Sequence, residues 1–150
     1  ACMILDTAQK AGCKILLPSD VVVAKLLNSD IENFVVPITD CPSNLMILDI
    51  GPKTLEKAKG ILVNSKTVIW NGPLGAFEIK PFDQATNILA NFVSNLSYNE
   101  KLISIAGGGD TLAALSNAEA SDGFSYLSTA GGAFLEWMEG KSLPGIKCLL

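Results

Sequence analysis

The sequence predicts an α/β fold: a three-layer α/β/α, Rossmann-like domain with a mainly parallel sheet. Apolar runs such as residues 21–23 and 68–70 lack polar alternation, as strands covered on both faces do. Stretches with helical spacing separate these runs. Two runs end directly in glycines, at Gly107 and near Gly131. In such folds ligands bind at the carboxyl ends of the strands.

The first half of the chain contains two helical stretches and several apolar runs. Residues 2–11 are expected to form a helix that Gly12 ends. Strands are predicted over residues 14–17, 21–24 and 46–50, and an apolar run over residues 34–36 leads to Pro37. Pro52 then begins a helix that continues to about residue 65, because proline suits the first turn of a helix.

The second half repeats a strand–turn–helix pattern. A strand over residues 66–70 leads into a loop rich in glycine and proline over residues 71–81. Apolar residues at helical spacing predict a helix over residues 84–96. Apolar runs at residues 102–106 and 124–127 each precede a glycine cluster and a helix-like stretch.

Composition excludes several classes of partner. The chain is 49% hydrophobic with a mean hydropathy of +0.37, yet no stretch approaches the ~18 apolar residues of a membrane-spanning helix. Eleven basic and fifteen acidic residues give a net charge of −4 without a basic cluster. We therefore expect neither a membrane nor a nucleic-acid partner.

The four cysteines are widely spaced, and no C-x-x-C pair occurs. They are typical of free thiols in a reducing cytosol rather than of a disulfide framework or a zinc site. The first residues also lack the basic start and cleavage pattern of a signal peptide. These features favour a cytoplasmic location.

The chain has no histidine. This absence excludes Ser-His-Asp and Cys-His nucleophilic catalysis and nearly all zinc hydrolases. The groups that remain available for catalysis are backbone amides, carboxylates, lysines and a hard metal ion. Phosphoryl transfer needs little more, because positioning and electrostatics supply most of its catalysis.

The two glycine clusters predict a phosphate site. Gly107, Gly108 and Gly109 follow one strand, and Gly131 with Gly132 follow the other. A strand that turns through glycines into a helix points bare N–H groups outward, and the helix dipole adds positive potential there. Two such turns about twenty residues apart indicate a polyphosphate ligand.

Asp110 allows two interpretations. It stands in the first turn of a predicted helix, where an aspartate often caps orphan amides. Beside a phosphate site it would instead hold Mg²⁺, while Thr111 donates to a phosphate oxygen. A bare carboxylate there would otherwise repel the ligand, which favours the metal.

The loop that follows Trp70 also allows two interpretations. Its Asn-Gly and Gly-Pro pairs are ordinary turn dipeptides, so a surface turn explains it. Alternatively it forms a wall of the ligand crevice. Pro73 and Leu74 would then face a base, Asn71 would donate an amide, and Glu78 would bind ribose hydroxyls.

Two common nucleotide motifs are absent. The first glycine cluster lacks the third glycine of G-x-G-x-x-G, and no G-K-[ST] sequence occurs. An adenine nucleotide would therefore bind through another architecture.

Taken together, the motifs resemble the nucleotide domain of the phosphoglycerate kinase family. They occupy residues 68–78, 106–111 and 127–133, with further similarity at residues 14–24, 48–52 and 135–145. The resemblance covers essentially the whole chain.

The resemblance implies reversible phosphoryl transfer between 1,3-bisphosphoglycerate with MgADP and 3-phosphoglycerate with MgATP. It places Asn71 and Thr111 on phosphates, Pro73 and Leu74 at the adenine and Glu78 at the ribose. It makes Asp110 the Mg²⁺ ligand and puts Gly131 and Gly132 at the phosphoryl group in transit. The implied nucleotide-binding set is Asn71, Gly72, Pro73, Leu74, Phe77, Glu78, Gly107, Gly108, Gly109, Asp110 and Thr111.

Two residues depart from the family pattern. Ala130 replaces a usual glycine, and its β-carbon is tolerable only if φ is negative. Ile47 replaces a glycine at the adenine pocket, where it would either narrow the pocket or point into the core.

The resemblance further implies that residues 1–150 are an incomplete carboxyl-terminal nucleotide domain, truncated at its amino end. The family's phosphoglycerate-binding domain has no counterpart in this sequence, and neither does the early part of its nucleotide domain with the lysines that grip the phosphates. We therefore expect one side of the sheet to have lost its cover. The isolated chain is then inactive, and the complete protein is expected to be a monomer. A non-catalytic nucleotide-binding module and a structural fragment remain as alternatives.

Overall fold

The computed structural model describes residues 1–149. Its elements are α1 (Cys2–Lys10), β1 (Asp20–Ala24), β2 (Asn33–Pro37), η1 (Ile38–Asp40), β3 (Met46–Ile50), α2 (Pro52–Val63), β4 (Thr67–Trp70), α3 (Gln84–Tyr98), β5 (Ile103–Gly107), α4 (Gly109–Asn117), η2 (Ser121–Gly123), β6 (Tyr126–Ser128), α5 (Gly131–Met138) and α6 (Pro144–Lys147). The predicted α/β class is confirmed. Over residues 1–149, every helix is too short or too polar to cross a bilayer.

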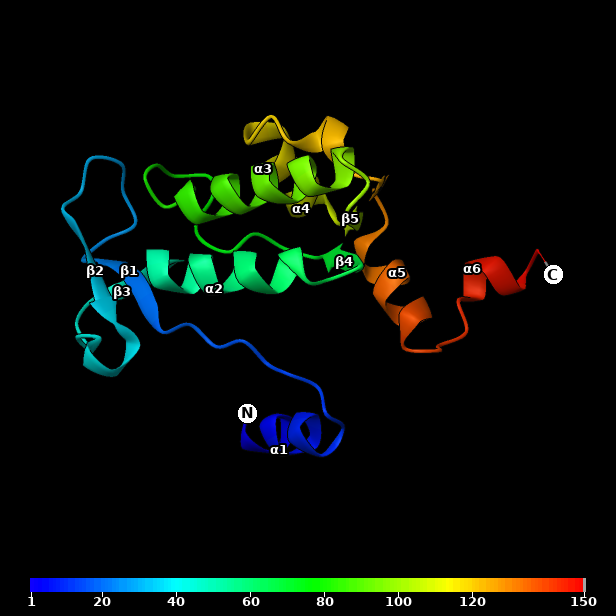
Figure 1. Ribbon diagram of the computed structural model, residues 1–150, viewed down its shortest axis with the longest axis horizontal. Coiled ribbons are helices and arrows are strands. Elements are labelled where there is room, and N and C mark those ends of the chain that lie inside the picture. Colours follow the sequence, from blue (N-terminus) through cyan, green and yellow to red (C-terminus); the bar gives the residue numbers. More distant parts are fainter. Residues whose placement is uncertain (150) are drawn as a thin grey trace.

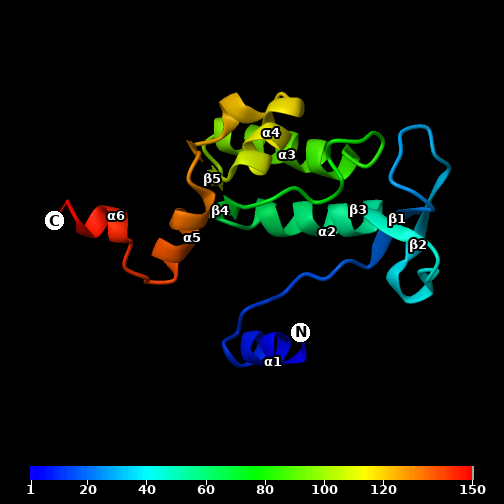
Figure 2. The same cartoon turned by 180° about the vertical axis from the view of Figure 1, so that it is seen from behind.

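The strands form two sheets at opposite ends of α2 (Figures 1 and 2). β4, β5 and β6 are parallel, and Trp70 pairs with Ala106 while Gly107 pairs with Ser128. This register places the three carboxyl ends at one edge. β2, β1 and β3 are antiparallel instead. The segment 25–32 is shorter than the dozen residues that a parallel crossover requires, so a parallel pair cannot form there.

The predicted strand over residues 14–17 is wrong for this structure. The segment forms no strand pairing, because no described strand lies alongside to accept its hydrogen bonds. It connects β1 to α1, which lies apart from the body of the fold in Figures 1 and 2. α1 buries none of its residues, and Met3 is 82% exposed.

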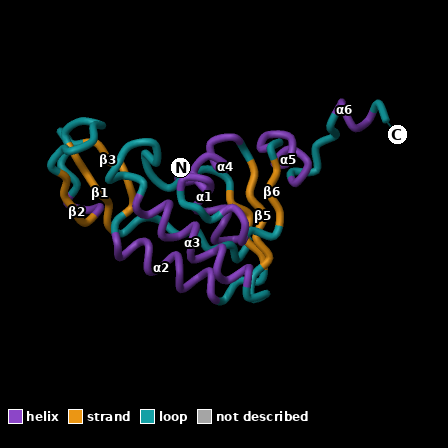
Figure 3. The backbone as a smooth tube through the Cα atoms, turned by 90° about the horizontal axis from the view of Figure 1, so that it is seen from above, coloured by secondary structure: helices purple, strands orange, loops and turns teal. Residues whose placement is uncertain are grey.

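Helices cover one face of the parallel sheet. Figure 3 shows α2, α3 and α4 on the same side of the strands, and their side chains share a core with Trp70, Ala106 and Phe124. On the other face Ile103 is 56% exposed and Tyr126 is 60% exposed. The expected loss of cover on one side is therefore present. The third layer of the expected sandwich does not occur within residues 1–149.

A buried carboxylate fixes the start of α2. Asp20, in β1, accepts hydrogen bonds from the N–H groups of Lys53 (3.0 Å) and Thr54 (2.7 Å). Burial raises the Asp20 pKa, but the bonds from the Thr54 hydroxyl and from these amides outweigh it, so the pKa lies below its usual 3.8. The antiparallel sheet and α2 are joined at this point.

Candidate functional site

The first glycine turn opens a helix at the carboxyl end of β5. Gly108 is the N-cap of α4 with φ of +101°, a conformation that favours glycine. The first-turn amides of α4, which belong to Gly109, Asp110 and Thr111, have no acceptor within the helix. They are available to an anion at this edge of the sheet.

The second glycine turn packs directly on the first. The Gly108 N–H donates to the Ser128 carbonyl at 3.2 Å, and a β-carbon on Gly131 would lie only 2.7 Å from the Gly108 Cα. Gly131 begins α5, and a β-carbon on its neighbour Gly132 would meet nothing within 4 Å. The starts of α4 and α5 are therefore adjacent, with Gly132 facing open space.

The loop after Trp70 lies next to the same two helix starts. The Gly72 N–H donates to Thr111 Oγ1 at 2.7 Å, and the Trp70 Nε1–H donates to the Gly72 carbonyl at 2.7 Å. A β-carbon on Gly108 would lie 3.6 Å from Thr111 Oγ1 and 3.7 Å from Asn71 Oδ1. Residues from all three predicted motifs thus meet around Gly108.

The rest of the loop continues along α3. The Leu74 N–H donates to Thr86 Oγ1 at 3.0 Å, and Pro73 and Leu74 are half-buried. A hollow of about 230 Å³ lies beside Asn71, Gly72 and Leu74. Phe77 is 8% exposed, whereas Glu78 lies on the surface. The structure brings Asn71, Gly72 and Leu74 together, and it turns Phe77 into the interior.

Thr86 is a site-forming residue that the sequence analysis missed. Its side chain is fully buried in α3 and holds the loop backbone at Leu74. The available signal was a hydroxyl on the apolar face of the helix, next to Ala85. Such a hydroxyl must have a hydrogen-bond partner when it is buried.

Asp110 is exposed in the first turn of α4. The N-cap is Gly108, and no side chain caps this helix, so the capping interpretation of Asp110 is not realised. No three His, Cys, Asp or Glu residues group as a metal site within residues 1–149. The Asp110 carboxylate nevertheless suits Mg²⁺, which usually takes one or two carboxylates and completes its shell with phosphate and water.

The structure shows the local surroundings of Ala130 and Ile47, the two residues that depart from the family pattern. Ala130 has φ of −93°, so its β-carbon is accommodated as expected. Ile47 is 53% exposed on β3. Of the two alternatives for Ile47, the structure therefore excludes a side chain in the core.

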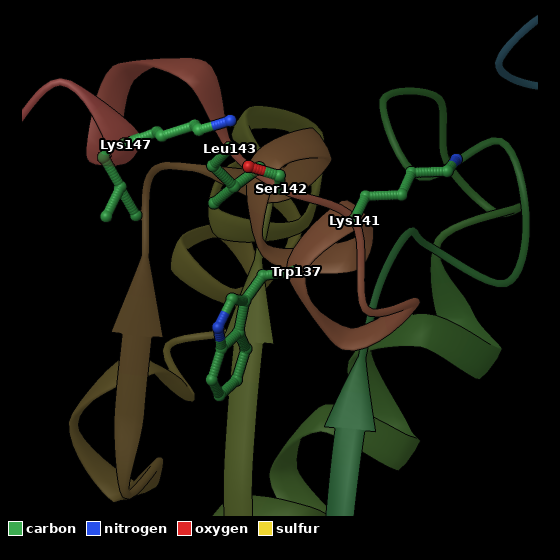
Figure 4. A pocket seen from close by; sticks show the side chains of 6 residues that line it. Trp137, Lys141, Ser142, Leu143 and Lys147 are labelled. Atoms are coloured by element: carbon green, nitrogen blue, oxygen red, sulfur yellow. The ribbon is translucent and has the colours of Figure 1, made fainter. Parts of the chain in front are cut away.

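A separate hollow of about 280 Å³ lies between α5 and α6, lined in part by Trp137, Lys141, Ser142, Leu143 and Lys147 (Figure 4). None of the predicted site residues lines it. This hollow and the glycine turns are different features of the fold.

Parallel strands whose carboxyl ends lead through glycines into adjacent helix starts are typical of phosphate-binding α/β proteins. A sequence model of the family described as "Phosphoglycerate kinase" matches residues 1–141. The chain belongs to this family.

Individual relatives agree with the family match. The chain is 58% identical over 146 residues to a phosphoglycerate kinase of Cereibacter sphaeroides, covering 97% of this chain and 37% of that protein. Over 150 residues, it is 55% identical to a phosphoglycerate kinase of Ruegeria pomeroyi, covering all of this chain and 38% of that one. The chain thus spans little more than a third of the length of these relatives.

Solved structures show the same likeness. Phosphoglycerate kinase from Coxiella burnetii superposes with a TM-score of 0.88 at 43% identity, over 97% of this chain and 36% of that chain. The enzyme from Pyrococcus horikoshii superposes with a TM-score of 0.72 at 26% identity, over 98% and 37% of the two chains.

Proposed function

We propose that this chain is the nucleotide-binding part of a phosphoglycerate kinase, which transfers a phosphoryl group between 1,3-bisphosphoglycerate with MgADP and 3-phosphoglycerate with MgATP. The acceptor in the reverse direction is a carboxylate. The observation that carries the proposal is the meeting of three motifs around Gly108, with the Thr111 and Asn71 side chains beside two helix starts. Family membership supports it.

The residues that meet around Gly108 take separate roles in this proposal. The Gly107–Thr111 turn and Asn71 hold the nucleotide phosphates through amides and side chains. Pro73 and Leu74 border the adenine, and Glu78 binds the ribose. The amides of Gly131 and Gly132 stabilise the phosphoryl group in transit, because charge develops on its oxygens during transfer.

Mg²⁺ would be held by Asp110 together with phosphate and water oxygens. When bound, it neutralises charge on the phosphates. Asp110 is suited to this role because its carboxylate is exposed and caps no helix.

The phosphoglycerate is assigned to residues outside this chain, since the chain spans 37% of the relative's length. The complete protein is proposed to be a monomer of the cytoplasm. The uncovered apolar face of the parallel sheet supports a further segment packing there.

Two assays test this function. The complete gene product should form ATP from 1,3-bisphosphoglycerate and MgADP, while the 150-residue chain should bind MgADP without turnover. Turnover by the 150-residue chain would contradict the assignment of the phosphoglycerate site. A complete gene product that neither binds MgADP nor forms ATP would contradict the function itself.

A further inference from the structure

Asp49 links two elements on either side of the nucleotide loop. It lies in β3 with its side chain 3% exposed. One carboxylate oxygen accepts the Ile50 N–H at 2.8 Å, and the other accepts the Ala85 N–H at 2.9 Å. Because Ala85 lies in the first turn of α3, this single carboxylate joins the antiparallel sheet to that helix.

The same carboxylate packs against the loop. A β-carbon on Gly75 would overlap the Asp49 carboxylate and lie 2.6 Å from the Phe82 carbonyl oxygen. The next residue, Ala76, donates its N–H to the Leu48 carbonyl at 2.8 Å. The loop backbone at residues 75–76 therefore packs on β3 and contacts it at Asp49.

Helix capping alone does not account for Asp49. Asp20 also caps a helix with a buried carboxylate, but its hydrogen bonds lower its pKa. For Asp49, burial outweighs the bonds from Ala85 and Ile50, and with the charge of Asp83 it raises the pKa to about 6. Ionising Asp49 at neutral pH therefore costs stability, and carboxyls with pKa values raised by burial cluster at functional sites.

We propose that Asp49 is a positioning residue for the nucleoside half of the ligand. The inference rests on the proposed function, in which Leu74 borders the adenine and Glu78 binds the ribose. These two residues flank the 75–76 backbone that Asp49 supports. The phosphate-binding turn at residues 107–111 is held independently by the hydrogen bond between Thr111 and Gly72. Asp49 therefore affects binding of the base and ribose and leaves binding of the phosphates unchanged.

The test compares two probes on the complete gene product: MgADP and magnesium tripolyphosphate, which lacks the nucleoside. Asp49→Ala should weaken MgADP binding about tenfold, because the loop backbone loses its support and the binding wall is no longer preorganised for the nucleoside. Binding of tripolyphosphate should change less than about twofold. Gly75→Ala should give the same pattern, since its methyl group displaces the loop from the carboxylate.

Asp20→Asn is the matched control. It removes a charge from an equally buried helix-capping carboxylate that makes no hydrogen bond to the loop within residues 1–149. It should lower thermal stability and leave both affinities unchanged.

If Asp49→Ala does not fold, Asp49→Asn replaces it in the same two binding measurements. Because it keeps one acceptor oxygen, about a threefold loss for MgADP alone is expected.

Equal weakening of both probes, or of neither, in Asp49→Ala and Asp49→Asn would overturn the positioning role. So would a loss of MgADP affinity in Asp20→Asn as large as in Asp49→Asn. A wild-type protein that binds tripolyphosphate but not MgADP, or binds neither, would overturn the proposed function and this inference with it.

Discussion

Gly131 packs against Gly108 so closely that a β-carbon on Gly131 would lie 2.7 Å from the Gly108 Cα. The two residues are far apart in sequence but begin neighbouring helices at one edge of the parallel sheet. Because of this contact, the two glycine turns form one continuous surface lined by backbone amides.

This contact predicts that Gly131→Ala destabilises the fold by about 1–3 kcal/mol, because an added methyl group must push the two turns apart. Gly132→Ala is the matched control for stability, since its methyl group would meet nothing within 4 Å. Chemical denaturation of both variants measures the difference. Equal stability of the two variants would contradict the close packing.

Thr111→Val should lose the acceptor for the Gly72 N–H while keeping the shape of the side chain. The cost is about 1–3 kcal/mol, since a partly buried donor is left unpaired. Hydrogen exchange at the Gly72 amide should accelerate. Thr111→Ser keeps the hydroxyl and should exchange like the wild type, so rapid exchange in both variants would argue against this bond.

Asp110→Asn should leave folding unchanged, because the exposed carboxylate caps no helix. It should reduce the affinity for ADP only when Mg²⁺ is present. Calorimetry with and without Mg²⁺ measures this difference, and Asp122→Asn serves as a control on the exposed surface of η2. An equal loss without the metal would contradict the assignment of Asp110 to Mg²⁺.

The two buried carboxyls should have opposite effects on the pH dependence of stability. The Asp49 pKa is about 6 in the fold against its usual 3.8, so its contribution is fully present below the usual value and is lost as pH rises to about 6. The Asp20 pKa is lowered, so its contribution is present above the usual value and is lost as pH falls.

Denaturation between about pH 4 and pH 6 checks this sign. The stability of the wild type relative to Asp49→Asn should fall as pH rises, on the order of 2–3 kcal/mol in total. Relative to Asp20→Asn it should rise with pH in the acidic range. A wild-type advantage over Asp49→Asn that grows from pH 4 to pH 6 would contradict the raised pKa of Asp49.

Local patterns were enough to predict most elements. The apolar run before Gly107 and the proline at position 52 predicted β5 and the start of α2 to within a residue or two. Local patterns failed where pairing decides structure. Residues 14–17 have strand composition but no described partner strand, and β1 pairs antiparallel because its connection to β2 is short.

The glycine turns and the Trp70 loop were predictable because their chemistry is local. Their convergence was not, since it depends on the register that aligns Trp70, Ala106 and Leu127 across the sheet. The roles of Thr86 and Asp49 were not predicted either. The hydroxyl of Thr86 on an apolar helix face was a signal, but the partners of the two side chains lie 12 and 36 residues away. The short helix α6 lies in a segment where no helical spacing was evident.

The most direct test of the central claim is amide chemical-shift mapping of the 150-residue chain during titration with MgADP. The largest shifts are expected at the amides of Gly72, Gly108, Gly109 and Thr111, with smaller ones at Gly131 and Gly132. The amides around Trp137 and Lys147, at the hollow between α5 and α6, should stay unchanged. Shifts confined to that hollow, or no shifts at any of the glycine turns, would contradict the account.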